Sequence, residues 1–125
     1  MDRENSSSSV IIVDDDQMIL NLLQDFLSRK GLKSQTFLSP LEALCVIRRQ
    51  KICVALVDIY MPEMSGVELL QQILKITPST HVIMITGIDD LETAKKCMEL
   101  GAKDYITKPF DMEYLKTSVL VELMT

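Results

Sequence analysis

Short apolar runs alternate along the chain with longer segments in which apolar residues recur every three or four positions. Residues 10–13, 54–57 and 82–85 are continuous apolar runs, which are typical of strands covered on both faces of a parallel sheet. Residues 33–37 can form another strand, and residues 105–107 a fifth. The pattern therefore predicts five strands, each followed by a helical segment.

The helical segments are recognised by apolar stripes and by residues that start or stop helices. The first segment stops near Gly31, a residue type that commonly ends helices. Ser39, Pro40 and Glu42 form a capping box with proline at the first helical position, and Asp111 can cap the last helix. In chain order, the apolar residues that indicate the five helices are Ile19, Leu22, Leu23, Phe26 and Leu27; Ala43, Leu44 and Ile47, the inner face of the second helix; Val67, Leu70, Ile73 and Leu74; Leu91, Ala94 and Met98; and Leu115, Val119 and Leu123.

Five repetitions of strand and helix predict one α/β domain over residues 10–125. Parallel strands are joined by right-handed crossovers, so helices cover both faces of the sheet and the result is a three-layer α/β/α sandwich. Residues 1–9 are charged and then serine-rich, with nothing apolar to bury, and we expect a flexible leader there.

Charge and composition narrow the possible functions. The formal net charge of −5 argues against direct nucleic-acid binding, which needs clustered Lys and Arg. No apolar run approaches the roughly 20 residues of a membrane span, so we expect a cytoplasmic protein without membrane contact. The cysteines, Cys45, Cys53 and Cys97, show no metal-binding spacing and are expected to be reduced thiols.

Four of the predicted strands end on residues that can carry chemistry. Ligands of such sheets bind beyond the carboxyl ends of the strands, where strand order reverses. Two unit charges 4 Å apart repel by about 4 kcal/mol at an effective dielectric of 20, so a group of carboxylates needs a cation. Mg²⁺ fits such oxygen ligands, and once the ion compensates the negative charge, one carboxylate can attack phosphorus. The strand-end residues are Asp14, Asp15, Asp58, Thr86 and Lys108.

Four motifs resemble those of the response-regulator receiver domains of two-component systems. They are IIVDDD at 11–16, LVDIYMPEMSG at 56–66, MITG at 84–87 and DYITKPF at 104–110. The resemblance implies a flavodoxin-like, doubly wound sheet of order 2-1-3-4-5. It also implies a phosphoacceptor switch, not a conventional enzyme, which receives its phosphoryl group from a sensor histidine kinase, a histidine phosphotransfer protein or a small phosphodonor.

Carried over position by position, the resemblance assigns roles to the strand-end residues. Asp58 would be the phosphoacceptor, Asp15 a direct Mg²⁺ ligand, and Asp14 a ligand mainly through water. The backbone carbonyl of Tyr60 would complete the metal shell. Thr86 and Lys108 would each bind a phosphoryl oxygen. The peptide bond between Lys108 and Pro109 is often cis in this family.

The resemblance also implies how the signal spreads. Thr86 would move inward, Tyr105 would turn as the aromatic switch, and the face formed by the fourth helix, fifth strand and fifth helix would change. That face would control an output domain or partner, and it could form a homodimer. Tyr60 and Ile88 are bulky residues at positions that tune access of hydrolytic water, from which we hypothesise a long-lived phosphoryl group.

Simpler interpretations stay open for several residues. Asp16 is best explained as a helix cap, His81 as structural, and Tyr105, without the family, as an aromatic at the core edge. A magnesium-dependent phosphatase would need a second acid where the chain has Tyr60. A flavodoxin-type electron carrier would need a phosphate-binding loop after the first strand, where the acids at 14–16 would repel the phosphate. An interaction module independent of phosphorylation would make no use of the set of acids, hydroxyl and lysine.

Overall fold

The computed structural model describes residues 9–125. The predicted flexible leader over residues 1–9 lies, apart from Ser9, outside the described residues. The strands are β1 (Val10–Val13), β2 (Ser34–Phe37), β3 (Val54–Asp58), β4 (His81–Gly87) and β5 (Asp104–Lys108). The helices are α1 (Gln17–Arg29), α2 (Pro40–Arg49), α3 (Gly66–Ile76), α4 (Leu91–Glu99) and α5 (Met112–Met124).

The strands form one parallel sheet of order β2-β1-β3-β4-β5, which confirms the predicted flavodoxin-like topology. The register brings the carboxyl ends of the central strands together. Val13 pairs with Val57, and Asp58 pairs with Ile85. The strand order reverses at β1, because β2 lies on one side of it and β3 on the other.

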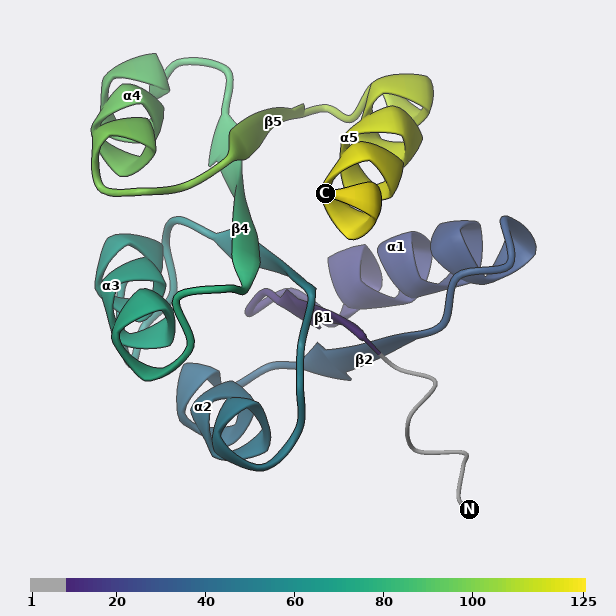
Figure 1. Cartoon of the computed structure of the whole chain (residues 1–125). Helices are drawn as coiled ribbons and strands as arrows, with labels where there is room; N and C mark the ends of the chain where they lie inside the picture. The colour runs from purple at the N-terminus through teal and green to yellow at the C-terminus, as the bar shows by residue number, and fades with distance from the viewer. Residues whose placement is uncertain (1–8) are drawn as a thin grey trace.

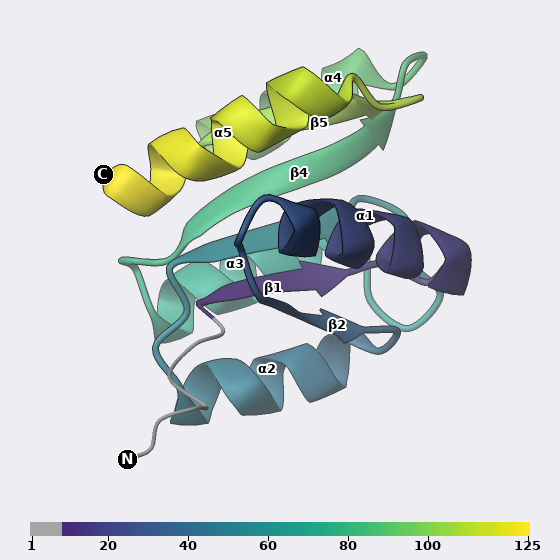
Figure 2. The same cartoon turned by 90° about the vertical axis from the view of Figure 1, so that its right-hand side faces the viewer.

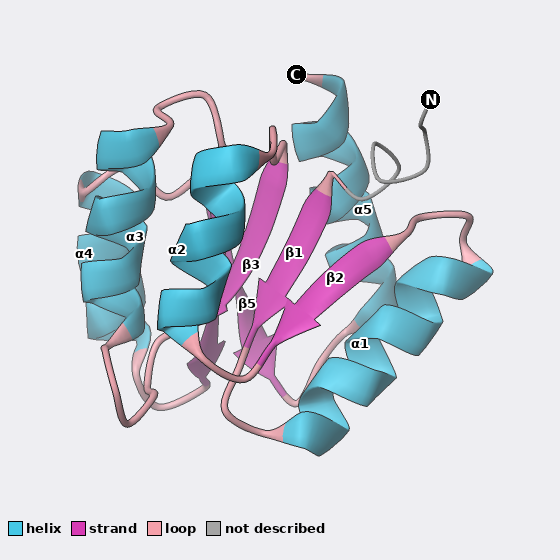
Figure 3. Ribbon diagram, turned by 90° about the horizontal axis from the view of Figure 1, so that it is seen from below, coloured by secondary structure: helices cyan, strands magenta, loops and turns pink. Residues whose placement is uncertain are grey.

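Helices cover both faces of the sheet, as the three-layer prediction requires. Helices α1 and α5 lie on one face, and α2, α3 and α4 lie on the other (Figures 1 and 3). Figure 2 looks onto one face of the sheet, with α1 in front of the strands and α3 behind them. Side chains of β1 alternate between the layers, because Ile11 and Val13 belong to the core under α2 and α3, whereas Val10 and Ile12 belong to the core under α1 and α5.

The predicted helix starts are confirmed at three caps. The side chain of Asp16 accepts a hydrogen bond from the backbone N–H of Met18 at 2.9 Å, and that of Asp111 accepts one from the N–H of Tyr114 at 3.1 Å. Ser39 caps α2, whose first residue is proline. Local sequence therefore places these helix boundaries without help from tertiary contacts.

Three of the apolar residues that indicated helices are exposed, although their helices are present. Leu22 is 48% exposed, Leu91 39% and Met98 37%, whereas the buried residues of α4 are Ala94 and Cys97. Successive helical residues are rotated by about 100°, so a stripe drawn through residue 98 lies one position away from the stripe that faces the sheet. No helix within residues 9–125 is both long and apolar enough to cross a membrane.

Candidate functional site

Three carboxylates meet at the carboxyl ends of β1 and β3. Asp14 follows β1, Asp58 is the last residue of β3, and the two strands are hydrogen-bonded neighbours. Asp14, Asp15 and Asp58 each offer a carboxylate oxygen, and these oxygens all lie within 4.8 Å of one another. Asp14 and Asp58 are buried, whereas Asp15 is exposed. The sequence prediction that these acids converge is confirmed.

Lys108 provides a positive charge to this group of acids. It is the last residue of β5, two strands away from β3 in the sheet. Its Nζ atom lies 3.4 Å from Oδ2 of Asp14 and 3.8 Å from Oδ1 of Asp58. One ammonium group thus contacts two of the three carboxylates, and the site keeps a net negative charge when all three are ionised. The Lys108–Pro109 bond is cis, as the family resemblance implies.

Burial and crowding favour the protonated forms of the two buried acids. Burial raises the pKa of Asp58 from 3.8 to about 7, the negative charge of Asp14 adds to this increase, and Lys108 opposes it. The pKa of Asp14 is also raised, mainly by burial, against the hydrogen bond from the backbone of Asp16 and the charge of Lys108. The site is therefore short of positive charge near neutral pH.

The oxygen atoms present fit a hard divalent cation. Oδ1 of Asp14 accepts a hydrogen bond from the backbone N–H of Asp16 at 2.9 Å, whereas its buried Oδ2 has no hydrogen bond and is compensated only by the ammonium of Lys108, 3.4 Å away and shared with Asp58. A buried carboxylate oxygen in this state requires compensation, and Mg²⁺ takes carboxylate oxygens of this kind together with water. The acidic group is thus consistent with the metal site of a receiver domain.

Gly66 fixes the loop that follows Asp58, a role that the sequence analysis did not assign. The backbone N–H of Gly66 donates a hydrogen bond to the carbonyl of Ile59 at 2.6 Å. A Cβ atom at position 66 would overlap the carbonyl oxygen of Asp58 and the Cα atom of Ile59. Only glycine allows the start of α3 to approach the end of β3 this closely. The Ser65-Gly66 pair at the end of the second motif was the available signal.

Thr86 is buried at the end of β4, but its hydroxyl is engaged away from the carboxylates. Its Oγ1 donates to the carbonyl oxygens of Gly87 and Asp90, each at 3.3 Å. Tyr60 is 61% exposed, and the neighbouring Asp90 carboxylate raises the pKa of its hydroxyl. The backbone N–H of Tyr60 works to lower the pKa of Asp58. Asp90, absent from the sequence predictions, therefore contacts Thr86 through its backbone carbonyl.

Tyr105 lies on β5, whose first residue makes a polar network that the sequence did not reveal. Tyr105 is partly buried against the core under α3 and α4. The carboxylate of Asp104 accepts hydrogen bonds from Tyr114 Oη at 2.8 and 2.7 Å and from Ser118 Oγ at 2.6 Å. The Asp104 carboxylate raises the pKa of Tyr114 to about 12. These contacts join β5 to α5.

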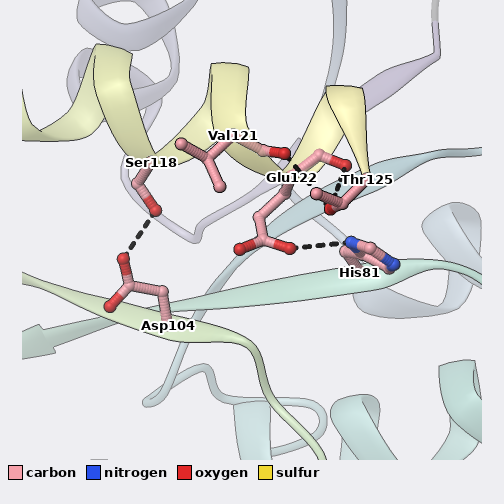
Figure 4. A network of polar contacts seen from close by, with 6 residues as sticks. All are labelled: His81, Asp104, Ser118, Val121, Glu122 and Thr125. Carbon is pink, nitrogen blue, oxygen red and sulfur yellow. Dashed lines mark hydrogen bonds and ion pairs between the residues drawn. The ribbon is translucent and has the colours of Figure 1, made fainter.

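His81 is structural, as expected. Its Nδ1 atom lies 2.7 Å from Oε1 of Glu122, which joins the start of β4 to the end of α5. Figure 4 shows this pair together with the contact of Asp104 and Ser118. Both pairs connect the sheet to α5, and neither includes a residue of the acidic group.

Comparison with known proteins identifies the family. The model of the response regulator receiver domain matches residues 10–120, so the chain belongs to this family. Over 105 residues the chain is 35% identical to the response regulator protein PilR of Pseudomonas aeruginosa, covering 84% of this chain and 24% of PilR. Over 98 residues it is 41% identical to the DNA-binding transcriptional regulator NtrC of Klebsiella pneumoniae, covering 78% of this chain and 21% of NtrC.

Solved structures agree with this assignment. The receiver domain of NtrX from Brucella abortus matches with a TM-score of 0.89 and 31% identity, covering 93% of this chain and 98% of that one. The chain spans less than half the length of the curated relatives named above. Because the family model and the solved structure agree, the chain is a receiver domain of two-component signalling, a phosphoacceptor switch rather than a conventional enzyme.

Proposed function

We propose that Asp58 is the residue that accepts the phosphoryl group. Among the three acids, it is the one at the end of the central strand β3, and its Oδ1 lies 3.8 Å from the Lys108 ammonium. The observation that carries the proposal is the grouping of three carboxylates at the edge of the sheet, two of them paired with one lysine. Family membership supports the same assignment.

The proposed metal ion is Mg²⁺, held by Asp15, Asp58 and the backbone carbonyl of Tyr60, with Asp14 acting mainly through water. The buried oxygen of Asp14, which only the Lys108 ammonium compensates, and the grouping of oxygens from Asp14, Asp15 and Asp58 support this ligand set. When bound, the ion neutralises negative charge on the carboxylates and on the phosphoryl oxygens. Part of the charge that it would offset is that of Asp14, which adds to the effect of burial in raising the pKa of Asp58.

In the proposed transfer, a carboxylate oxygen of Asp58 attacks phosphorus in line with the leaving group. The new bond joins oxygen to phosphorus, and the bond from phosphorus to the donor's histidine nitrogen breaks. Lys108 pairs with an equatorial phosphoryl oxygen, and Thr86 donates a hydrogen bond to another after its hydroxyl turns from its present carbonyl partners. Asp58 must be deprotonated to attack, which the Lys108 charge favours.

The same residues supply the proposed conformational switch. Moving a two-state equilibrium from 1:99 to 99:1 requires about 5.5 kcal/mol, which one hydroxyl hydrogen bond of roughly 1 kcal/mol cannot provide. Lys108 and the metal contacts must therefore contribute most of the difference. Inward movement of Thr86 would vacate space for Tyr105, and the surface of α4, β5 and α5 would change with it.

The donor is proposed to be a sensor histidine kinase or a histidine phosphotransfer protein, with small phosphodonors as substitutes. Family membership supports this partner and a cytoplasmic location. Two further expectations stay predictions: a homodimer through the face of α4, β5 and α5, and no direct contact of this chain with nucleic acid. The negative formal charge supports the second of them.

Intact-mass measurement after incubation with acetyl phosphate and Mg²⁺ tests the proposal. The wild-type chain should gain the mass of one phosphoryl group, and Asp58→Ala should gain none. Asp16→Asn is a matched control, because Asp16 caps α1 beside the site but contributes no oxygen to the acidic group. Phosphorylation that survives in Asp58→Ala would show that another residue is the acceptor.

A further inference from the structure

The stretches of chain that lead from the first three helices into strands carry cations and no acids. Residues 26–41, 43–57 and 69–88 contain no Asp or Glu, although the whole chain has a formal net charge of −5. In these stretches, the exposed cations that form no ion pair within the described part of the chain are Lys30, Lys33, Arg48, Arg49, Lys51 and Lys75. We call this group of residues the basic end.

The basic end lies where the strands start, at the opposite end of the sheet from the acidic group. Val10 of β1 pairs with Ser34 of β2 and with Val54 of β3. Val54 pairs in turn with His81 of β4, so these strands begin at the same level. Neighbouring strands lie about 4.8 Å apart, so the connections into β2, β3 and β4 span roughly 15 Å. Figure 3 shows the connections from α1 to β2 and from α2 to β3 at the tails of the strand arrows.

Hydrogen bonds between neighbouring connections fix the backbone of the basic end. Thr80 Oγ1 donates to the carbonyl of Ile52 at 2.6 Å, and both residues are buried. Gln35 Nε2 donates to Gln50 Oε1 at 3.0 Å, which joins β2 to the end of α2. The cations are therefore carried by connections that the fold already holds in place, so binding at this surface does not require a loop to become ordered first.

Helix polarity explains only part of this distribution of charge. Cations near the carboxyl end of a helix interact favourably with the helix dipole, and Arg48, Arg49 and Lys75 occupy last turns. Lys33 and Lys51 lie beyond the helices, in the connections themselves. The result is a positive surface that no acid in the described part of the chain neutralises.

We propose that the basic end is a docking surface for an acidic segment of a partner protein, rich in Asp and Glu. Carboxylates of such a segment would pair with the exposed ammonium and guanidinium groups. The proposal goes beyond the function of the acidic group and does not depend on the role of Asp58. It gives the domain two separate surfaces, one for phosphoryl transfer and one for a protein partner.

Range and surface chemistry favour a short acidic segment over nucleic acid or a membrane. Helix α2 has 10 residues and separates the two ends of the domain by about 15 Å, which exceeds the Debye length of about 8 Å at physiological salt. A segment confined to the basic end is therefore screened from the acidic group, whereas an extended polyanion also approaches the acidic side of a chain with net charge −5. No large exposed apolar side chain that could enter a bilayer lies in residues 30–33, 50–53 or 77–80.

Fluorescence anisotropy with a labelled oligoglutamate peptide tests the proposal at physiological ionic strength. The 125-residue chain should bind the probe, and the affinity should fall as salt rises. The double variant Arg48→Gln/Arg49→Gln should weaken binding several-fold, because each exposed ion pair contributes modestly. Lys33→Gln/Lys51→Gln should have a similar effect. In NMR spectra, the probe should shift the backbone amide signals of Lys33 and Lys51 and leave that of Asp58 unchanged.

The matched control is Lys95→Gln/Lys96→Gln, which removes exposed cations of α4 that lie between Glu92 and Glu99. It changes the net charge equally and should keep wild-type affinity. An equal loss in this control, or no binding of the probe by the wild type, would overturn the proposal.

Other occupants are tested in the same buffer. Tighter binding of duplex DNA, of anionic phosphatidylserine vesicles or of a second copy of the chain would overturn the proposal, because the occupant would then not be an acidic segment of a partner protein. Phosphorylation by acetyl phosphate with Mg²⁺ should proceed in every variant. Its absence in the wild type would contradict the proposed role of Asp58 and leave the docking surface unaffected.

Discussion

Gly66 lies so close to Asp58 that a side-chain carbon on the glycine would overlap the carbonyl oxygen of the aspartate. The contact makes the first turn of α3 a support for the end of β3. The position of the candidate phosphoacceptor therefore depends on the lack of a side chain at a residue eight positions later in the sequence.

Gly66→Ala should reduce the free energy of unfolding by roughly 1 to 3 kcal/mol, the usual cost of forcing atoms into a packed region. Alanine forms helices better than glycine, so helix propensity alone predicts the opposite result, an increase in the free energy of unfolding. Urea denaturation measures the change. Gly87→Ala is the matched control, because a Cβ atom there would meet only the side chain of Asp89, at 3.1 Å. An equally large loss in both variants would contradict the explanation.

Lys108→Ala should separate phosphorylation from the conformational change. The ammonium of Lys108 lies 3.8 Å from Asp58 Oδ1 and is proposed to bind a phosphoryl oxygen. Without it, acetyl phosphate should still modify the chain, but the NMR signals of Thr86 and Tyr105 should stay near their resting positions. Lys103→Ala removes an exposed lysine just before β5 and should respond like the wild type. A full wild-type response in Lys108→Ala would argue against this role.

Mg²⁺ should stabilise the chain more as pH rises. The pKa of Asp58 in the folded metal-free chain is about 7, above its ordinary value of 3.8. The fold therefore favours the protonated carboxyl, and the contribution of Asp58 to stability is complete below pH 3.8, declines as pH rises, and is lost above about pH 7. This increase in the pKa of Asp58 corresponds to at most about 4 kcal/mol in the free energy of unfolding.

Thermal unfolding with and without Mg²⁺ checks this dependence. The increase in Tm on adding Mg²⁺ should be larger at about pH 7.5 than at about pH 5.5, since the ion binds the ionised carboxylates. Asp58→Asn should reduce this pH dependence and should stabilise the metal-free chain at the higher pH. A Mg²⁺ effect that is equal at both pH values in the wild type would refute the electrostatic explanation.

The phosphoryl group should persist for a comparatively long time. Tyr60 and Ile88 flank the site at 61% and 67% exposure, and neither holds a water molecule well. Phosphoryl mass followed after removal of the donor should decline slowly in the wild type and several-fold faster in Ile88→Gln, whose amide can orient water. Val121→Gln, at an exposed position on α5, should leave the rate unchanged. Rapid decay in the wild type would rule out this effect.

The sequence predicted the sheet and the acidic group because both follow from where strands end. Asp14, Asp58 and Lys108 each stand at or just after the last residue of a strand, and parallel strands bring these ends to one edge. The caps at Asp16 and Ser39 could also be predicted from the sequence, since capping is a local interaction.

The remaining features depend on contacts that no local pattern encodes. The overlap that requires Gly66, and the hydrogen bond from Thr86 to the Asp90 carbonyl, arise in the connections between strands and the helices that follow them. In α4, Leu91 and Met98 are apolar yet exposed, while the buried residues are Ala94 and Cys97. Hydrophobicity alone does not reveal which side of a short helix faces the sheet.

The inward hydrogen bonds of Asp104 change what another molecule would meet on this side of the domain. Its carboxylate is surrounded by Tyr114 and Ser118 within the same chain, whereas the preceding Lys103 is exposed. The rim of β5 consequently displays a cation whose neighbouring anion is already engaged. A molecule that binds at this rim therefore gains more binding energy from acidic groups than the neighbouring Lys103 and Asp104 in the sequence would suggest.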